Sequence, residues 1–188
     1  DLAATRAALR AAAEQHDLII TSGGVSVGEE DHLRNAVLAE GGLDFWALAI
    51  KPGKPFVFGW IHRADGSRAL YMGLPGNPVA SFVTFLMLVR PVLGLLAGEG
   101  WHLPQAVSLV ADFSWPKPDK RREFLRARLN EQGRVVLHPH QGSGVLSSAA
   151  WAEGVVDLPS GTIVRPGDAV KFISMAELVQ PSISARQP

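Results

Sequence analysis

The sequence predicts an α/β domain, in which helices cover a layered sheet, followed by a small all-β module built as a barrel or a sandwich. Up to about residue 98, segments with helical spacing alternate with short apolar segments rich in β-branched residues, which is typical of an α/β layer. After that point only short strand-like segments follow, separated by turns rich in Gly and Pro. A domain boundary is therefore expected near residues 98–104.

Local signals define the first elements. Asp1 is a favoured N-cap, and alanine and leucine at helical spacing follow it to about Gln15. The chain thus supplies only a helix before its first strand, so the first half of this α/β domain is expected to be missing. The further elements expected here are a helix over 31–40, which Gly41 and Gly42 are expected to end, and strands over 17–22, 45–50, 55–61 and 69–74.

The longest apolar segment runs over residues 79–98. Asn77 and Pro78 precede it and form a favoured pair at a helix start. Because Arg90 and Pro91 interrupt its second half, a buried helix that ends or kinks at Pro91 is favoured over a membrane span. In the second module, strands are expected over 107–113, 123–129, 135–138, 155–158 and 169–173.

Composition excludes several classes of protein. The 188 residues include 18 basic and 18 acidic side chains, so a general nucleic-acid or membrane-surface partner is disfavoured. The absence of cysteine excludes disulfides, thiolate metal sites and a cysteine nucleophile.

The segment 21–31, TSGGVSVGEED, links a predicted strand to a predicted helix. Its glycines allow the backbone to approach a ligand closely, and ligands of open α/β sheets bind at such strand ends. Asp31 stands where the helix begins and could hold a Mg²⁺ ion that bridges to phosphate. A plain βα turn is the alternative. The segment also matches G-x-S-x-G, but its strand ends four residues before Ser26, which disfavours a serine hydrolase.

Two further loops also stand at strand ends. Lys51 and Lys54, in the sequence KPGKP, bring two ammonium groups close together, and a bound oxyanion would relieve their repulsion. The alternative is a solvated turn with separated lysines. The sequence LPGNP places Gly76 and Asn77 before a helix, where capping alone would also explain Asn77.

The β module carries weaker signals. Residues 117–128 hold six basic and two acidic side chains, and residues 141–144, QGSG, offer hydrogen-bond donors. A solvated strand face and a flexible loop are the alternatives. His138 and His140 share one strand face but lack a third ligand, so a metal site there is disfavoured.

At this point three ordered motifs become recognisable. The chain resembles the molybdopterin molybdenumtransferase family, which includes MoeA and the gephyrin E-domain. The resemblance rests on the sequences TSGGVSVGEED, FWALAIKPGKPFVFG and GLPGNPVASFVTF, and on HQGSGVLSS in the β module. The resemblance implies a three-layer α/β/α molybdopterin-binding domain over residues 1–100 and a C-terminal β domain over residues 101–188. It also implies that this chain corresponds to the C-terminal half of the family and lacks its N-terminal domains, so that it would be inactive alone.

The resemblance further implies a function. Family members take adenylated molybdopterin and molybdate, release AMP and insert molybdenum with the help of Mg²⁺, as cytoplasmic homodimers that need neither nucleic acid nor membrane. A molybdopterin adenylyltransferase-like domain is one alternative, although that class lacks a β module. A non-catalytic gephyrin-like scaffold is the other, and the choice between molybdenum and tungsten stays open.

The residues that match the family's motifs follow from the same resemblance. Asp31, Lys51 and Lys54 would be catalytic, with Asp31 also the metal ligand. Ala47 stands where many relatives carry a basic residue, which removes one anion contact. Substrate-binding residues would be Ser22, Gly23, Gly24, Ser26, Gly28, Pro75, Gly76 and Asn77, and molybdate-binding residues would be Lys51, Lys54, Pro55, Arg126 and Ser143.

Overall fold

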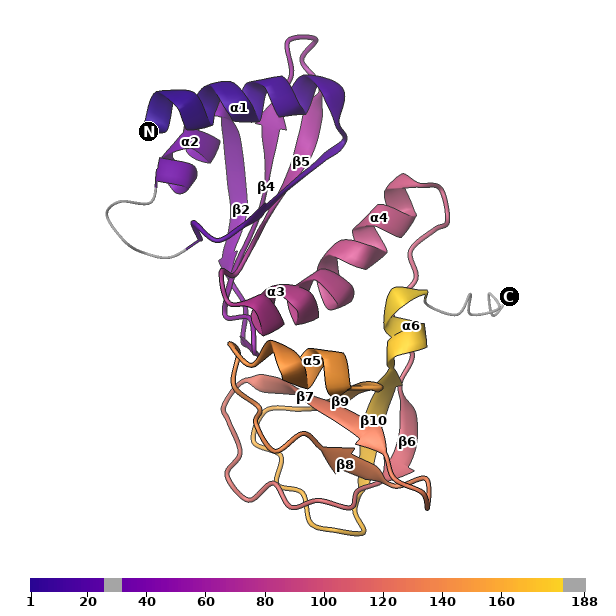
Figure 1. Ribbon diagram of the computed structural model, residues 1–188. Coiled ribbons are helices and arrows are strands. Elements are labelled where there is room, and N and C mark those ends of the chain that lie inside the picture. Colours follow the sequence, from indigo (N-terminus) through magenta and orange to yellow (C-terminus); the bar gives the residue numbers. More distant parts are fainter. Residues whose placement is uncertain (26–31, 181–188) are drawn as a thin grey trace.

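The computed structural model describes residues 1–25 and 32–180, apart from the side chains of residues 45 and 46. Two modules lie end to end, an α/β module from the first part of the chain and a β module from the second (Figure 1). The long helix near the middle of the chain lies between them.

The α/β module is built on a mixed sheet with the strand order β1-β5-β4-β2. Strands β1 and β5 are parallel, whereas β4 runs antiparallel to both of its neighbours. The bounds are β1 Leu18–Ser22, β2 Gly41–Ala47, β4 Pro55–His62 and β5 Arg68–Leu74.

Helices cover both faces of this sheet, which confirms the expected three-layer α/β/α arrangement. On β4, Val57 and Ile61 pack with Leu9 of one helix layer, while Phe56 packs with Val89 of the other. This alternation follows from the two-residue period of a strand. The first layer consists of α1 Leu2–Gln15 and α2 His32–Glu40, and the second of α3 Pro78–Thr84, a π-helical turn η1 Phe85–Val89 and α4 Arg90–Leu96.

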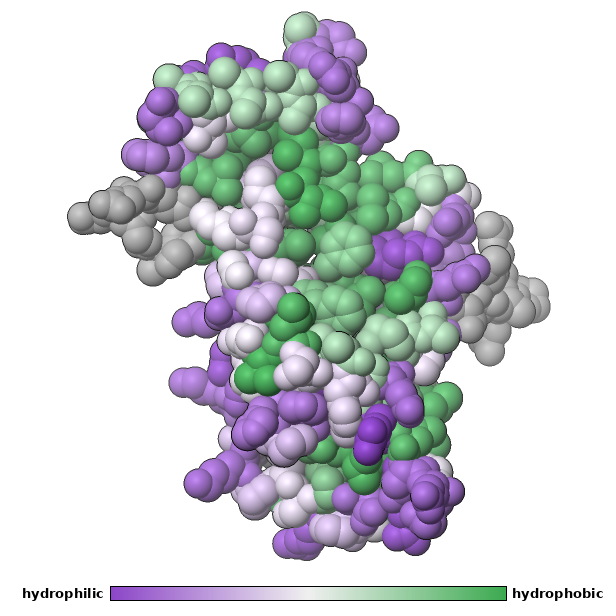
Figure 2. Space-filling model, viewed as in Figure 1, coloured by the Kyte–Doolittle hydropathy of each residue, from purple (hydrophilic) through white to green (hydrophobic). Residues whose placement is uncertain are grey.

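The sequence predicted a helix that ends or kinks at Pro91. The helix that begins at Pro78 does not end there but runs on to Leu96. Pro91 falls in the first turn of α4, directly after the π-helical turn, and a missing N–H is tolerated near such a start. By length and composition the helix is able to cross a membrane. Its inner side is nevertheless buried in the protein core, while apolar surface remains over α4 (Figure 2).

The β module forms a sheet in the order β3-β7-β9-β10-β6. Strand β8 also pairs with β7, along the edge of β7 that lies opposite β9. A bridge between Ala111, next to β6, and Val135, the first residue of β8, brings the two sides together. The sheet is therefore barrel-like, around a core that includes Leu125, Val156 and Phe172. The bounds are β3 Ile50–Lys51, β6 Val107–Val110, β7 Arg122–Leu129, β8 Val135–Leu137, β9 Gly154–Leu158 and β10 Ala169–Ser174.

Two features join the modules. Val79 and Val83 of α3 share an apolar cluster with Phe124 and Ile173 of the β module. Strand β3 lies within the first 100 residues of the chain but pairs with β7. Two short helices, α5 Leu146–Trp151 and α6 Met175–Val179, complete the β module.

The strand expected over residues 45–50 is in fact two strands in different sheets. Strand β2 begins at Gly41, directly after α2, and β3 covers only Ile50–Lys51. Gly41 does more than end a helix, because a Cβ there would lie 1.8 Å from the Trp60 carbonyl oxygen. The glycine pair that resembled a helix stop allows close strand pairing instead.

Candidate functional site

Three loops meet at one edge of the α/β sheet. The parallel strands β1 and β5 end side by side, with Ser22 opposite Leu74. The antiparallel strand β4 begins at Pro55, at the same edge. The strand directions therefore bring the three loops together.

The first and third loops contact each other through their backbones. Gly23 N donates a 3.0 Å hydrogen bond to Leu74 O, and Ser22 Oγ lies 3.4 Å from Pro75 O. Gly23 has a φ of +83°, and a Cβ on Gly76 would lie 3.6 Å from Gly23 Cα. Glycine at both positions thus permits this close approach.

The second loop crosses from one module to the other. Lys51 ends β3, a cis peptide bond joins it to Pro52, and Gly53 follows with a φ of +120°. A Cβ on Gly53 would lie 2.5 Å from Thr84 Cγ2, so only glycine fits between the loop and α3. Lys54 then leads into β4.

A cavity of about 310 Å³, here called the junction cavity, lies where these loops face the β module. It gathers seven of the predicted site residues, and Arg121 and Gln141 lie beside them. The predicted residues on its lining are Lys51, Lys54, Pro55, Pro75, Gly76, Asn77 and Ser143.

The loops around the junction cavity are held in place by the backbone. Val79 N, at the start of α3, donates a 3.1 Å hydrogen bond to Ser143 O of the β module. Asn77 occupies the N-cap position, but its side chain makes no capping hydrogen bond. Capping therefore does not account for its side chain.

A second cavity of about 360 Å³, here called the arginine cavity, adjoins the first. Both cavities are lined by Lys51, Pro52, Gln141 and Gly142. Arg126 lines the arginine cavity. Lys51 and Arg126, which come from different modules in the chain, thus share one cavity.

Arg126 is a buried cation, with only 1% of its surface exposed. Its guanidinium donates to Ser148 Oγ, Phe124 O and Gly142 O at 3.2–3.3 Å, and no carboxylate within residues 1–25 and 32–180 pairs with it. Burial lowers the pKa of the Arg126 guanidinium to about 10, so it still carries its charge at neutral pH. A buried charge without a counter-ion favours the binding of an anion.

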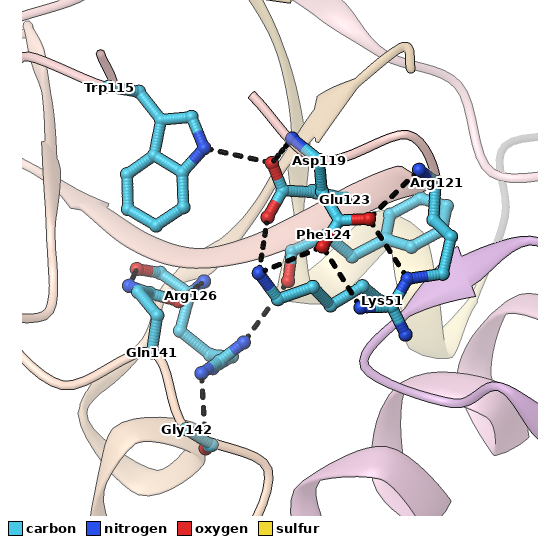
Figure 3. Close-up of polar contacts among 9 residues, drawn as sticks. All are labelled: Lys51, Trp115, Asp119, Arg121, Glu123, Phe124, Arg126, Gln141 and Gly142. Carbon is cyan, nitrogen blue, oxygen red and sulfur yellow. Dashed lines mark hydrogen bonds and ion pairs between the residues drawn. The ribbon is translucent and has the colours of Figure 1, made fainter. Parts of the chain in front are cut away.

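Lys51 stands between two carboxylates (Figure 3). Its Nζ lies 3.0 Å from Glu123 Oε1 and 3.3 Å from Asp119 Oδ2. Arg121 in turn donates to both oxygens of Asp119 at 2.9 Å. Lys51 and Arg121 are therefore neutralised within the protein, whereas no described residue forms an ion pair or a side-chain hydrogen bond with Lys54.

Asp119 supplies a test at acid pH. Hydrogen bonds from Arg121, with a further contribution from Lys51, hold the pKa of the Asp119 carboxyl well below its usual value of 3.8. Because the folded pKa is the lower one, its stabilising contribution is present above about pH 4 and is lost as the pH falls further. In urea denaturation at pH 7 and pH 3, Asp119→Asn is expected to lose less stability on acidification than the wild type. Asp112→Asn, which removes an exposed carboxylate, should behave as the wild type; equal pH dependence of all three proteins would contradict the assignment.

Other predicted residues lie elsewhere. Ser22 and Gly23 contact the third loop. Neither cavity is lined by Ser22, Gly23 or Gly24. Ser26, Gly28 and Asp31 lie outside the described residues.

His138 and His140 make their contacts within the β module. His138 Nδ1 lies 3.0 Å from His140 O, and the His138 ring packs edge-on against Trp151. Among the residues that the structure describes, no three His, Asp or Glu side chains are grouped as metal ligands.

Sequence reasoning missed four residues around the cavities. The charged segment 117–128 contained three of them, but its excess of positive charge concealed the two carboxylates that pair with Lys51. The missed residues are Trp115, Asp119, Arg121 and Glu123, whereas Gln141 lies in the segment 141–144, whose hydrogen-bond donors the sequence indicated.

Comparisons with known proteins agree with this architecture. Residues 1–94 match the family model described as "Probable molybdopterin binding domain", and residues 108–175 match "MoeA C-terminal region (domain IV)". The first match places the α/β module among molybdopterin-binding domains.

The relatives are more specific. The molybdopterin molybdenumtransferase of Haemophilus influenzae is 43% identical over 143 residues, which cover 73% of this chain and 34% of that protein. The Drosophila melanogaster molybdenum cofactor synthesis protein cinnamon is 36% identical over 163 residues, which cover 80% of this chain and 25% of that protein. The chain belongs to the molybdopterin molybdenumtransferase family, MoeA, and corresponds to its C-terminal part.

Solved structures share the fold. A molybdopterin biosynthesis MoeA protein from Pyrococcus horikoshii superimposes with a TM-score of 0.63 at 28% identity, covering 84% of this chain and 37% of that one. A molybdenum cofactor biosynthesis protein from Pyrococcus furiosus superimposes with a TM-score of 0.67 at 24% identity. This match covers 90% of this chain and 53% of that one. The chain thus spans about a third of the length of the first curated relative and about half of the Pyrococcus furiosus protein.

Proposed function

We propose that the protein acts in molybdenum cofactor biosynthesis, where it inserts molybdenum from molybdate into adenylated molybdopterin and releases AMP. The observation that carries this proposal is the junction cavity, in which the loops of the molybdopterin-binding module face the β module. The arginine cavity beside it offers a buried cation. Two adjoining cavities suit two substrates that must react with each other.

The charges suit anionic substrates. Lys54 and Arg126 carry two positive charges that no described carboxylate neutralises, and molybdate is a dianion. Arg126 has five N–H groups, of which three donate within the protein, so two remain for an oxyanion. The Ser143 hydroxyl and the Asn77 amide would add neutral donors from opposite sides of the junction cavity.

Magnesium is assigned to Asp31 by the sequence, from the place of this carboxylate at a predicted helix start and from the family resemblance. Asp31 lies outside the described residues, and the described residues offer no cluster of three acidic or histidine ligands. When bound, Mg²⁺ would polarise the phosphoryl group that water attacks.

The β module favours insertion over the adenylyltransferase alternative. Arg126 and Ser143 both come from this module, and an adenylyltransferase-like domain lacks it. No contact among the described residues specifically favours a scaffold. The homodimer and the cytoplasmic location remain part of the proposal, and light scattering of the purified protein tests the dimer.

The test is a turnover assay on the protein as its gene encodes it. Adenylated molybdopterin, Mg²⁺ and molybdate or tungstate are added, and the AMP released is quantified by chromatography. We expect AMP release that depends on the oxyanion, and the preferred oxyanion identifies the metal inserted. The proposal would be contradicted if AMP were released at the same rate without any oxyanion, or if no AMP were released with either molybdate or tungstate.

A further inference from the structure

Glu123 is a buried carboxylate with a hydrogen bond to one oxygen and an ion pair at the other. Its exposed surface is 2%, and its Oε2 accepts a 2.8 Å hydrogen bond from Trp115 Nε1. Its Oε1 has no hydrogen-bond partner but lies 3.0 Å from Lys51 Nζ. A carboxylate with so little exposure needs a cation beside it, and Lys51 is that cation.

The backbone places these two residues directly opposite each other. In the parallel pairing of β3 with β7, Lys51 is the register partner of Glu123. Arg122 N donates a 2.9 Å hydrogen bond to Ala49 O and continues the pairing. The position of Lys51 is thus set by the β module, although the residue belongs to the loop that leads into β4.

The Lys51 ammonium keeps one donor for a ligand. Of its three N–H groups, Glu123 and Asp119 can occupy two. The side chain remains 41% exposed, and it lines both the junction cavity and the arginine cavity. Lysine is a point charge on a flexible stem, so without such partners it would have no fixed place between the cavities.

We propose that Glu123 is a positioning residue, which holds the Lys51 ammonium at the boundary of the two cavities with one N–H free for the reacting anions. The proposal rests on the function proposed above. A positioning role and a purely electrostatic role of Glu123 predict opposite effects when its negative charge is removed. Removing only a negative charge near an anion site strengthens anion binding, whereas releasing Lys51 from its position slows the reaction itself.

Turnover by Glu123→Gln tests this difference. The glutamine keeps an acceptor for Trp115 but loses the charge that holds Lys51. We expect kcat for AMP release to fall by roughly 10- to 100-fold, as displacement of a positioned group can cause, with a KM for molybdate that is unchanged or lower. An unchanged kcat, or a change confined to KM, would overturn the proposal.

A matched control addresses stability. Asp157, a buried carboxylate on β9, pairs with Arg122 and contacts neither Lys51 nor the cavities. Asp157→Asn removes an ion pair of the same module, in which the Arg122 side chain is half exposed, and should keep the wild-type kcat. Trp115→Phe, which removes one of the two hydrogen bonds to Glu123 Oε2, should also lower kcat, but by less. A kcat loss in Asp157→Asn equal to that in Glu123→Gln would overturn a specific role for Glu123.

A second readout does not need turnover. The rate at which an acylating reagent modifies each lysine is measured by mass spectrometry, with Lys54 as the internal reference. In Glu123→Gln, acylation of Lys51 relative to Lys54 is expected to rise by about fivefold or more, and in Asp157→Asn it should not change. An unchanged ratio in Glu123→Gln would overturn the positioning role even if the wild type turns over. If the wild type releases no AMP but the ratio rises, the proposed function fails while Glu123 still positions Lys51.

Discussion

Replacing Arg126 by methionine is expected to lower kcat/KM for molybdate by on the order of 10²- to 10⁴-fold. Two charge-assisted hydrogen bonds to an oxyanion contribute about 1.5–3 kcal/mol each, and about 1.4 kcal/mol corresponds to a factor of ten. Methionine approximately fills the space of the stem but has no N–H group. The assay is AMP release as a function of molybdate concentration.

Two further variants make this result specific. Arg128 lies on the same strand, but its guanidinium stacks over Trp151 at 4.5 Å from the ring centroid and lines neither cavity. Arg128→Met should therefore keep the wild-type kcat/KM. Arg126→Lys keeps the charge but loses the planar fork, so an intermediate loss is expected. If Arg126→Met and Arg128→Met behave alike, the arginine cavity is not the oxyanion site.

Replacing Lys51 by methionine is expected to affect both activity and stability. Activity should fall by about 100-fold or more, because Lys51 lines both cavities and an absent catalytic cation cannot be replaced from bulk solvent. The free energy of unfolding should fall by about 1–2 kcal/mol, since Glu123 loses its cation. This figure is below the usual cost of breaking a buried pair because Lys51 is partly exposed.

The double variant Lys51→Met with Glu123→Gln separates the two effects. With both charges removed, most of the lost stability should return, as for buried pairs replaced by neutral groups. Activity should stay as low as in Lys51→Met alone. Urea denaturation and AMP release measure the two quantities on the same preparations. Recovery of activity together with stability would show that Lys51 matters only for folding.

The loops were predictable because their signals are local. Glycine and proline restrict the backbone within a few residues, so Gly23, Gly53 and Gly76 marked strand ends that the structure indeed brings together. The order of the modules was predictable for the same reason, because helical and strand periodicity repeat within short segments.

Other features depend on the partner of each residue and were misread. Gly41 looked like a helix stop, yet the carbonyl of Trp60 requires a glycine there. In the sequence KPGKP, Lys51 and Lys54 looked alike. The pairing of β3 with β7 places Lys51 beside the carboxylates of Glu123 and Asp119. Lys54, in contrast, has no ion-pair partner among the described residues. Nothing in the neighbouring residues of either lysine encodes this difference.

By itself, the sequence determined a helix-and-strand module followed by a β module, with three glycine-containing loops at one sheet edge. Only the tertiary structure decided which cations remain unpaired at that edge and which are neutralised. The physical reason is the sequence distance over which each effect acts. Backbone preferences act between chain neighbours, whereas the ion pairs of Lys51 and the burial of Arg126 depend on residues that meet only after both modules have folded.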